Sequence, residues 1–225
     1  MQNQLHPIFW LWIPIFVFLG QVVAKLTLPY SEVSSLYNEN GLFEILQFFT
    51  LVAAIIVCLV YLAKESRINS GILSGWFVLA MICCIYVAGE EVSWGQHIIG
   101  WATPEEWAQY NDQNETNIHN TSSWFDQKPR LLLLIGICFG SLIMPYLSFI
   151  KNMPRDQFLS QVTPPKISFV IALIILVPHL VEKILETYQL TFFSRYSEIQ
   201  ETYMFYFVFV YLLNLRLNLK QAKKD

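Results

Sequence analysis

The sequence predicts an all-α, polytopic membrane protein, a bundle of six transmembrane helices with a short interfacial helix in the outer loop. Of its 225 residues, 55% are hydrophobic and only 14% are charged, whereas soluble domains carry about 25% charged residues. The mean hydropathy is +0.43. These values exclude a water-soluble globular protein.

Six apolar runs approach the roughly 20 residues that a helix needs to cross the hydrocarbon layer. The predicted spans are residues 8–28, 42–63, 72–92, 131–150, 167–185 and 199–215, of which the last is the shortest. The first run is expected to be a retained helix and not a cleaved signal peptide, because it is long and no Lys or Arg precedes it. No repeat or soluble domain is visible in the sequence, so residues 1–225 are expected to form a single transmembrane domain.

The positive charges are distributed unevenly between the two faces of such a bundle. Nine of the 14 Lys and Arg residues fall in the loops near 64–71 and 151–166 and in the carboxyl tail. Since these residues are enriched in cytoplasmic loops, both termini are expected in the cytoplasm, in a multi-pass protein of the inner (cytoplasmic) membrane. Fourteen of the 17 acidic residues lie at or near the opposite, periplasmic or extracellular face. The formal net charge of −3 argues against a nucleic-acid partner.

The longest loop, residues 93–130, follows the third span and is expected to contain a short helix. Thr103 is a suitable N-cap, Pro104 suits the first helical position, and Glu106 can close a capping box. Four of the seven tryptophans lie in this loop, and tryptophan favours the headgroup layer. We therefore expect the loop to lie on the outer membrane surface.

The strongest local signal is the segment GEEVSWGQH, residues 89–97, at the outer end of the third span. Two adjacent carboxylates, Glu90 and Glu91, are costly to desolvate there, and such groups take a proton, bind a metal or meet a cation. If the helix continues, Glu90, Trp94 and His97 share one face. The alternative is that the pair only marks the water interface and that Gln96 and His97 solvate the loop.

A second polar segment, NDQNETNIHN, occupies residues 111–120 of the same loop. Glu115 and His119 are four residues apart and would face one site on a helical turn, where the amides of Asn117 and Asn120 orient them or bind substrate. The alternative is a solvated loop with Asn and Asp at turn positions.

The fifth and sixth spans add further ionisable groups. His179 and Glu182 share a helix face in the outer half of the fifth span, next to Pro178, and an intramembrane ionisable group is a functional candidate by default. The alternative is a histidine hydrogen-bonded to a neighbouring helix. Glu198 and Glu201 begin the sixth span, where a helix N-terminus also favours carboxylates.

One outer pocket is expected to collect these groups. The catalytic candidates are Glu90, Glu91, Glu115, His119 and His179. The substrate-binding candidates are Trp94, Gln96, Asn117, Asn120 and Glu182. His119, His179 and Glu91 are candidate ligands of a divalent metal that activates water, and the alternative is a metal-free glutamate base.

The favoured function is a hydrolase or transferase that acts on a lipid-linked or membrane substrate at the outer face, in contact with the lipid bilayer. The sequence contains no H-E-x-x-H, G-x-S-x-G or phosphate-binding glycine loop. Two alternatives stay open: a transporter or proton-coupled channel, and a non-catalytic membrane assembly protein. The nearly apolar inner halves of the spans argue against a pore.

These motifs resemble those of a little-characterised family of bacterial multi-pass membrane proteins, which pairs G-E-E-[IV]-S-W-G-Q with E-T-N-[IL]-H-N. In this chain the two motifs are residues 89–96 and 115–120. The family more often has Arg at the position of His97, which disfavours His97 as a metal ligand. A weaker similarity is to the CAAX-type intramembrane proteases, whose E-E-x-x-x-R motif matches Glu90 and Glu91 but places Gly95 at the Arg position. That similarity implies a mechanistic analogy only.

Overall fold

The structure, a computed structural model, describes residues 2–37, 41–68, 70–111, 115–118, 121–151, 157–193 and 195–222. All regular secondary structure within these ranges is helical. Six helices are long and apolar enough to cross a membrane: Ile8–Thr27, Leu42–Lys64, Gly71–Glu91, Gln127–Leu147, Lys166–Thr187 and Tyr196–Gln221. The all-α polytopic membrane fold and its six predicted spans are therefore confirmed.

Five of the spans are built on one long helix each, and the fourth consists of two helices joined by a π-helical turn. The long helices are α1 (Ile13–Thr27), α3 (Leu42–Lys64), α4 (Gly71–Glu91), α7 (Ser123–Cys138), α8 (Met144–Lys151), α10 (Phe169–Thr187) and α11 (Tyr196–Gln221). π-Helical turns precede α1 (Ile8–Trp12) and join α7 to α8 (Phe139–Ile143). The connections contain the short helices α2 (Tyr30–Leu36), α5 (Gln96–Ile99), α6 (Glu105–Ala108) and α9 (Gln157–Val162).

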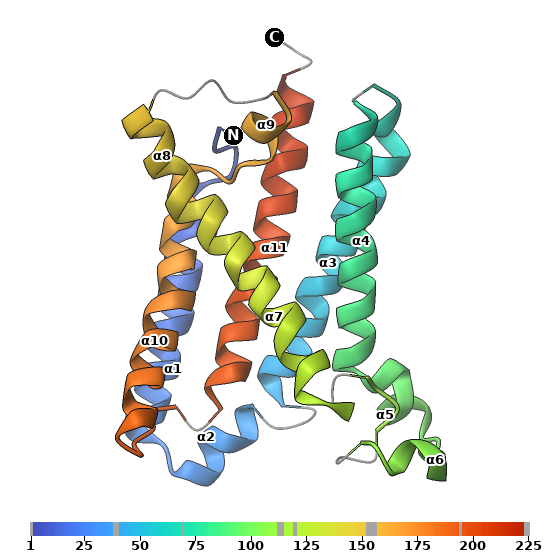
Figure 1. Cartoon of the computed structure of the whole chain (residues 1–225), viewed down its shortest axis with the longest axis vertical. Coiled ribbons are helices and arrows are strands. Elements are labelled where there is room, and N and C mark those ends of the chain that lie inside the picture. The colour runs from blue at the N-terminus through green and yellow to red at the C-terminus, as the bar shows by residue number, and fades with distance from the viewer. Residues whose placement is uncertain are drawn as a thin grey trace.

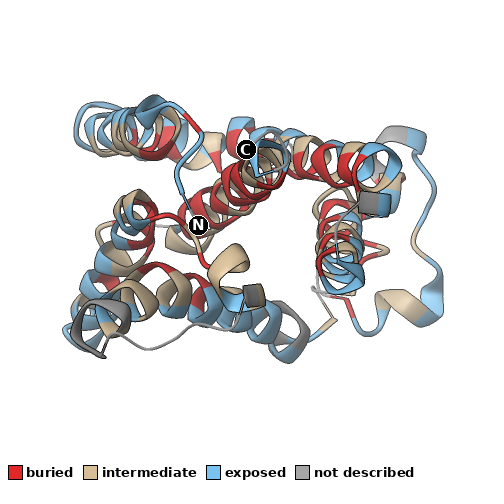
Figure 2. Cartoon of the chain, turned by 90° about the horizontal axis from the view of Figure 1, so that it is seen from above, coloured by how far each residue is buried: buried red, intermediate tan, exposed pale blue. Residues whose placement is uncertain are grey.

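The last helix, α11, is the centre of the bundle. It stands between the α3–α4 pair and the α1–α10 pair, and α7 crosses in front of it (Figure 1). Other parts of the protein bury 56% of its most apolar stretch, against 17–33% for the other five spans. Seen from above, buried residues concentrate on α11 and on the faces turned toward it (Figure 2). Exposed large apolar side chains cover the outer faces, as a lipid solvent requires.

The sixth span is longer than predicted because the polar residues near its end are satisfied within the protein. Arg216 donates from Nε and Nη2 to Oε1 of Glu65, at 3.1 and 2.8 Å. Asn214 is fully buried and accepts a 2.8 Å hydrogen bond from the backbone N–H of Gln4. Paired in this way, polar side chains do not end the helix, although they lower the apolarity of the sequence.

Both termini lie at one end of the bundle, and α2, α5 and α6 lie at the other, which we call the loop end (Figure 1). The short helix expected after Thr103 is present as α6. The expected capping box is wrong, however, because the N-cap is Pro104 and no side chain caps the helix. Thr103 Oγ1 instead accepts a hydrogen bond from Gln96 Nε2 at 2.8 Å.

Candidate functional site

Helix α4 ends at Glu91 and the chain then reverses through a left-handed turn. Ser93, Trp94 and Gly95 have φ angles of +45°, +55° and +95°, which residues other than glycine rarely adopt. The helix therefore does not continue through Trp94, and the condition under which Glu90, Trp94 and His97 would share one helix face is not met. The side chains of Glu90 and Trp94 still meet, because the turn folds Trp94 back onto α4.

Glu90 connects the helix to the loop through both of its carboxylate oxygens. Its Oε1 accepts from Trp94 Nε1 at 2.7 Å, and its Oε2 accepts from the backbone N–H of Ile118 at 2.6 Å. The side chain is only 3% exposed. Gly89 makes room for the tryptophan, since a Cβ atom there would lie 2.8 Å from the ring. Glu90 thus has a structural role that adjacent carboxylates in a sequence do not reveal.

A second set of contacts joins the two sequence motifs directly. Ser93 Oγ donates to Glu115 Oε2 at 2.7 Å, and Asn117 Nδ2 donates to both of these atoms. Asn111 donates to Asn117 Oδ1 at 2.9 Å and accepts from the backbone N–H of Glu115 at 3.2 Å. All four residues are buried, so their polar atoms depend on one another for hydrogen bonds.

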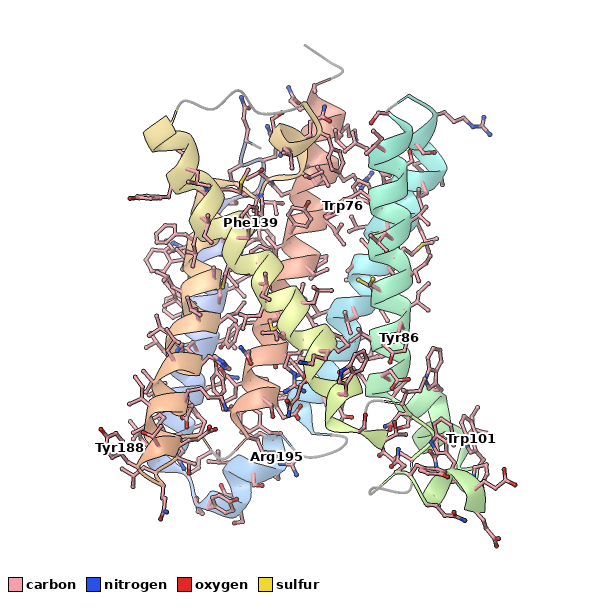
Figure 3. All side chains as sticks on the ribbon, in the orientation of Figure 1. Trp76, Tyr86, Trp101, Phe139, Tyr188 and Arg195 are labelled. Carbon is pink, nitrogen blue, oxygen red and sulfur yellow. The ribbon has the colours of Figure 1, made fainter. Side chains whose placement is uncertain are left out.

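Gln96 completes the connection with both ends of its amide. Its Oε1 accepts from the backbone N–H and hydroxyl of Thr116, at 2.7 and 2.8 Å. Its Nε2 donates to the carbonyl of Trp101 and to Thr103. We call the whole set the loop clamp: Glu90, Ser93, Gln96, Asn111, Glu115, Thr116 and Asn117. The clamp holds the loop against the end of α4, and Trp101 projects among the side chains at that end (Figure 3).

Glu91, the neighbour of Glu90, takes no part in the loop clamp. It is half-buried and, within the part of the chain that the structure describes, makes no hydrogen bond or ion pair. Its electrostatic neighbours are three carboxylates, those of Glu201, Glu198 and Glu44, and the guanidinium of Arg130. We call Glu91 and these four residues the acidic cluster.

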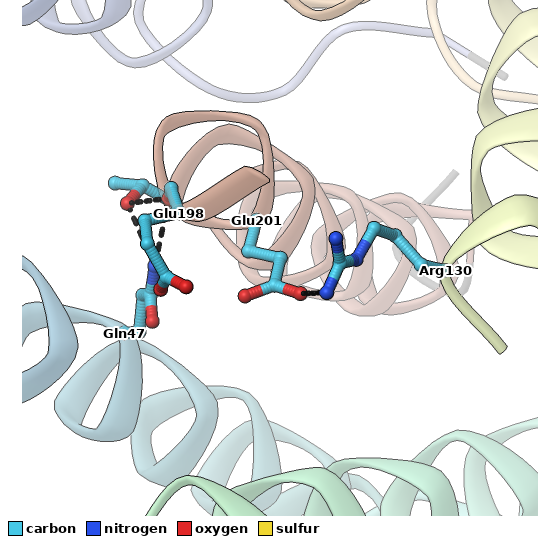
Figure 4. A network of polar contacts seen from close by, with 5 residues as sticks. Gln47, Arg130, Glu198 and Glu201 are labelled. Carbon is cyan, nitrogen blue, oxygen red and sulfur yellow. Dashed lines mark hydrogen bonds and ion pairs between the residues drawn. The ribbon is translucent and has the colours of Figure 1, made fainter. Parts of the chain in front are cut away.

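The acidic cluster joins four helices at the loop end. Arg130 of α7 forms an ion pair with Glu201 of α11, with 2.5 Å between Nη2 and Oε1 and with side chains 21% and 13% exposed. Gln47 of α3 donates to the backbone carbonyl of Glu198 at 2.9 Å and to Thr202 Oγ1 at 3.0 Å (Figure 4). These contacts hold α3, α7 and α11 together beside the end of α4.

Sequence reasoning gave Glu44 and Arg130 no role and favoured a helix-end explanation for Glu198 and Glu201. A usable signal was present, however. Glu44 opens the second span, and Arg130 directly precedes the fourth apolar run. In a bundle of alternating spans these positions lie at the same end as Glu91.

The groups of the fifth span lie elsewhere. Glu182 accepts the backbone N–H groups of Phe193 and Phe192, at 2.8 and 3.2 Å, and so fixes the turn after α10. The His179 ring lies 5.9 Å from the Tyr196 ring, centroid to centroid. Because α10 and α4 stand on opposite sides of α11 (Figure 1), His179 is not brought to Glu91.

The candidate metal ligands do not converge in the region that the structure describes. No group of three or more His, Cys, Asp or Glu side chains within it is arranged to hold a metal ion. His119 and Asn120 lie outside the described residues, so the structure does not place either of them. Glu91 is on α4 and His179 is on α10, and these two helices lie on opposite sides of α11 (Figure 1).

No protein-family model, curated protein or solved structure matches this chain. Its function is therefore inferred from the geometry and chemistry of the site.

Proposed function

We propose that the protein is an inner-membrane hydrolase or transferase in which Glu91 is the general base. The observation that carries this proposal is the difference between two adjacent carboxylates. Both oxygens of Glu90 accept hydrogen bonds, from Trp94 and from the backbone of Ile118. Glu91 has no hydrogen-bond partner among the described residues and lies near the other members of the acidic cluster. A general base needs a carboxylate that can accept a proton from a reacting group.

The charges around Glu91 support proton transfer. The acidic cluster contains four carboxylates and one guanidinium, so full ionisation would leave a large negative charge in a partly dry place. Neighbouring carboxylates in such a site share protons. An unprotonated carboxylate of the cluster can accept the proton of an attacking hydroxyl or water, and the cluster can then return a proton to the leaving group.

The position of the cluster favours a membrane substrate. It lies where α3, α4, α7 and α11 meet the loop end, and the nearby Trp94 and Trp101 are exposed aromatic side chains of the kind that lie among headgroups. A lipid or lipid-linked molecule in the bilayer therefore has the bonds of its headgroup at the level of Glu91. The Lys and Arg distribution supports a loop end on the periplasmic or extracellular side, with both termini in the cytoplasm.

In this proposal the other motif residues act as positioning residues. Glu90, Glu115, Gln96 and Asn117 hold the loop beside the acidic cluster, and His119 stays a candidate proton carrier or metal ligand from the sequence alone.

Glu91→Gln tests the proposal because it keeps the size of the side chain and removes its basicity. The purified protein is incubated with phospholipids and lipid-linked sugars, and products are measured by mass spectrometry. Loss of a general base typically lowers the rate about 100- to 10,000-fold, and we expect this with an unchanged unfolding temperature. The matched control is Glu186→Gln, an exposed carboxylate on α10, which should keep full activity.

Two outcomes would contradict the proposal. One is a Glu91→Gln variant that turns over the same lipid at the wild-type rate. The other is proton or cation flux through reconstituted vesicles that Glu91→Gln blocks while no lipid is altered, which would favour the transporter alternative. Elemental analysis of the wild type and of Glu91→Ala separates a metal-bound from a metal-free glutamate.

A further inference from the structure

An apolar groove of about 550 Å³ lies on the α1–α10 side of the bundle, across α11 from Glu91. Phe18 and Val22 of α1 form one wall, Val177 and Val181 of α10 form the other, and Phe193 closes the floor. We infer that this groove binds one acyl chain of an anionic phospholipid whose phosphate contacts Lys25. The site is separate from the proposed active site and does not depend on Glu91.

The groove is open toward the medium that surrounds the spans. Val177 and Val181 are 49% and 45% exposed on its rim. On its inner side Phe18 packs against Phe193 and against Tyr203 of α11, with centroids 6.4 and 6.2 Å apart. Because α1 and α10 are both candidate membrane spans, the surrounding medium is hydrocarbon, and an acyl chain is the molecule that fills an apolar groove there.

Lys25 supplies the charge that selects the lipid. Positions 18, 22 and 25 of α1 follow the i, i+4, i+7 spacing of one helix face, so Lys25 continues the α1 wall one turn closer to the loop end. It is half-buried and has no ion pair or hydrogen bond with any residue that the structure describes. Lysine stems lie along apolar surface and extend the ammonium group toward headgroups. An anionic phosphate is the matching partner.

Glu182 lines the same groove but does not oppose this charge. It is 4% exposed, and its two oxygens accept the backbone N–H groups of Phe192 and Phe193. Its carboxylate is thus turned into the α10 turn and not toward a headgroup.

Lipid binding to the full chain in detergent can be measured by native mass spectrometry with phosphatidylglycerol and phosphatidylcholine of the same chain length. One lysine near a headgroup is worth about a five-fold preference for anionic lipid, and we expect this preference in the wild type. Lys25→Gln should abolish the preference. Its control, Lys183→Gln, removes an exposed lysine that is paired with Glu186 and should leave the preference unchanged.

Val177→Trp fills the groove and should lower the binding of both lipids several-fold. Leu180→Trp, on the same helix and 51% exposed outside the groove, is the matched control and should bind like the wild type. Val22→Trp fills the groove from the opposite wall and should lower lipid binding in the same way. It replaces Val177→Trp as the test if that variant is not monodisperse.

The inference is overturned if groove-filling variants retain as much lipid as Leu180→Trp, or if Lys25→Gln keeps the full preference for phosphatidylglycerol. Glu91→Gln leaves the groove intact and should bind phosphatidylglycerol like the wild type. Failure of this inference is therefore distinguishable from failure of the proposed catalytic role.

Discussion

Glu90→Gln perturbs the loop clamp at its central contact with almost no change in volume. In the wild type both carboxylate oxygens accept hydrogen bonds, from the indole N–H of Trp94 at 2.7 Å and from the backbone N–H of Ile118 at 2.6 Å. A glutamine amide has only one oxygen. In either orientation its NH₂ group therefore faces a donor, and one hydrogen bond is lost.

The expected loss follows from the burial of this site. A hydrogen bond to a charged group contributes about 1.5–3 kcal/mol, and a buried donor left without a partner adds a further penalty. Since Glu90 is 3% exposed, we expect the upper part of this range, about 3 kcal/mol. With 1.4 kcal/mol per factor of ten, the open fraction of the loop rises roughly 100-fold.

Limited proteolysis measures this opening. Chymotrypsin cleaves after Trp101, Trp107 and Tyr110 once the loop leaves the end of α4, and its rate follows the open population when reclosing is fast. We expect Glu90→Gln to be cleaved roughly 100-fold faster than the wild type. Glu91→Gln should match the wild type, because Glu91 takes no part in the loop clamp. Equal cleavage rates for the two variants would refute the assigned division between these carboxylates.

Two further substitutions test the same end of the bundle. Gly89→Ala places a Cβ 2.8 Å from the Trp94 ring and displaces the ring, at a cost of about 2 kcal/mol. The rate of chymotrypsin cleavage should therefore rise roughly 30-fold. An unchanged rate would contradict the close approach of Trp94 to Gly89. Arg130→Gln removes the ion pair between Arg130 and the Glu201 carboxylate, which is 13% exposed, and should lower the unfolding temperature by roughly 4–8 °C, for about 2 kcal/mol. Adding Glu201→Gln should restore most of that loss, and a double variant no more stable than Arg130→Gln would show that the ion pair does not couple the two helices.

The spans were predictable from sequence because the thickness of the bilayer fixes the length of an apolar helix. The end of the third span was not. The left-handed backbone at Ser93 and Trp94 is unfavourable for these residues in isolation, and it is held by hydrogen bonds of Ser93 with Glu115 and Asn117, more than 20 residues away. Of the three turn residues, only Gly95 carries a local signal for such a conformation.

The candidate site was predictable in part. Glu91 was a candidate because adjacent carboxylates at a membrane boundary stand out in any sequence. The different roles of Glu90 and Glu91 depend on which side chain faces the loop and which faces α11. The spacing of residues in the sequence does not give that information. For Arg130 and Glu44 the sequence indicates only the end of the bundle at which they lie, and the packing of α3, α7 and α11 brings them beside Glu91.

The central position of α11 has a consequence for biogenesis. The ribosome delivers this helix after the other five spans, so the helices on its two sides enter the membrane before the element that joins them exists. The acidic cluster cannot assemble until then, because Glu198 and Glu201 are on α11. A nascent chain halted before α11 would therefore lack the two acceptors of the Gln47 amide, which belong to Glu198 and Thr202 of α11.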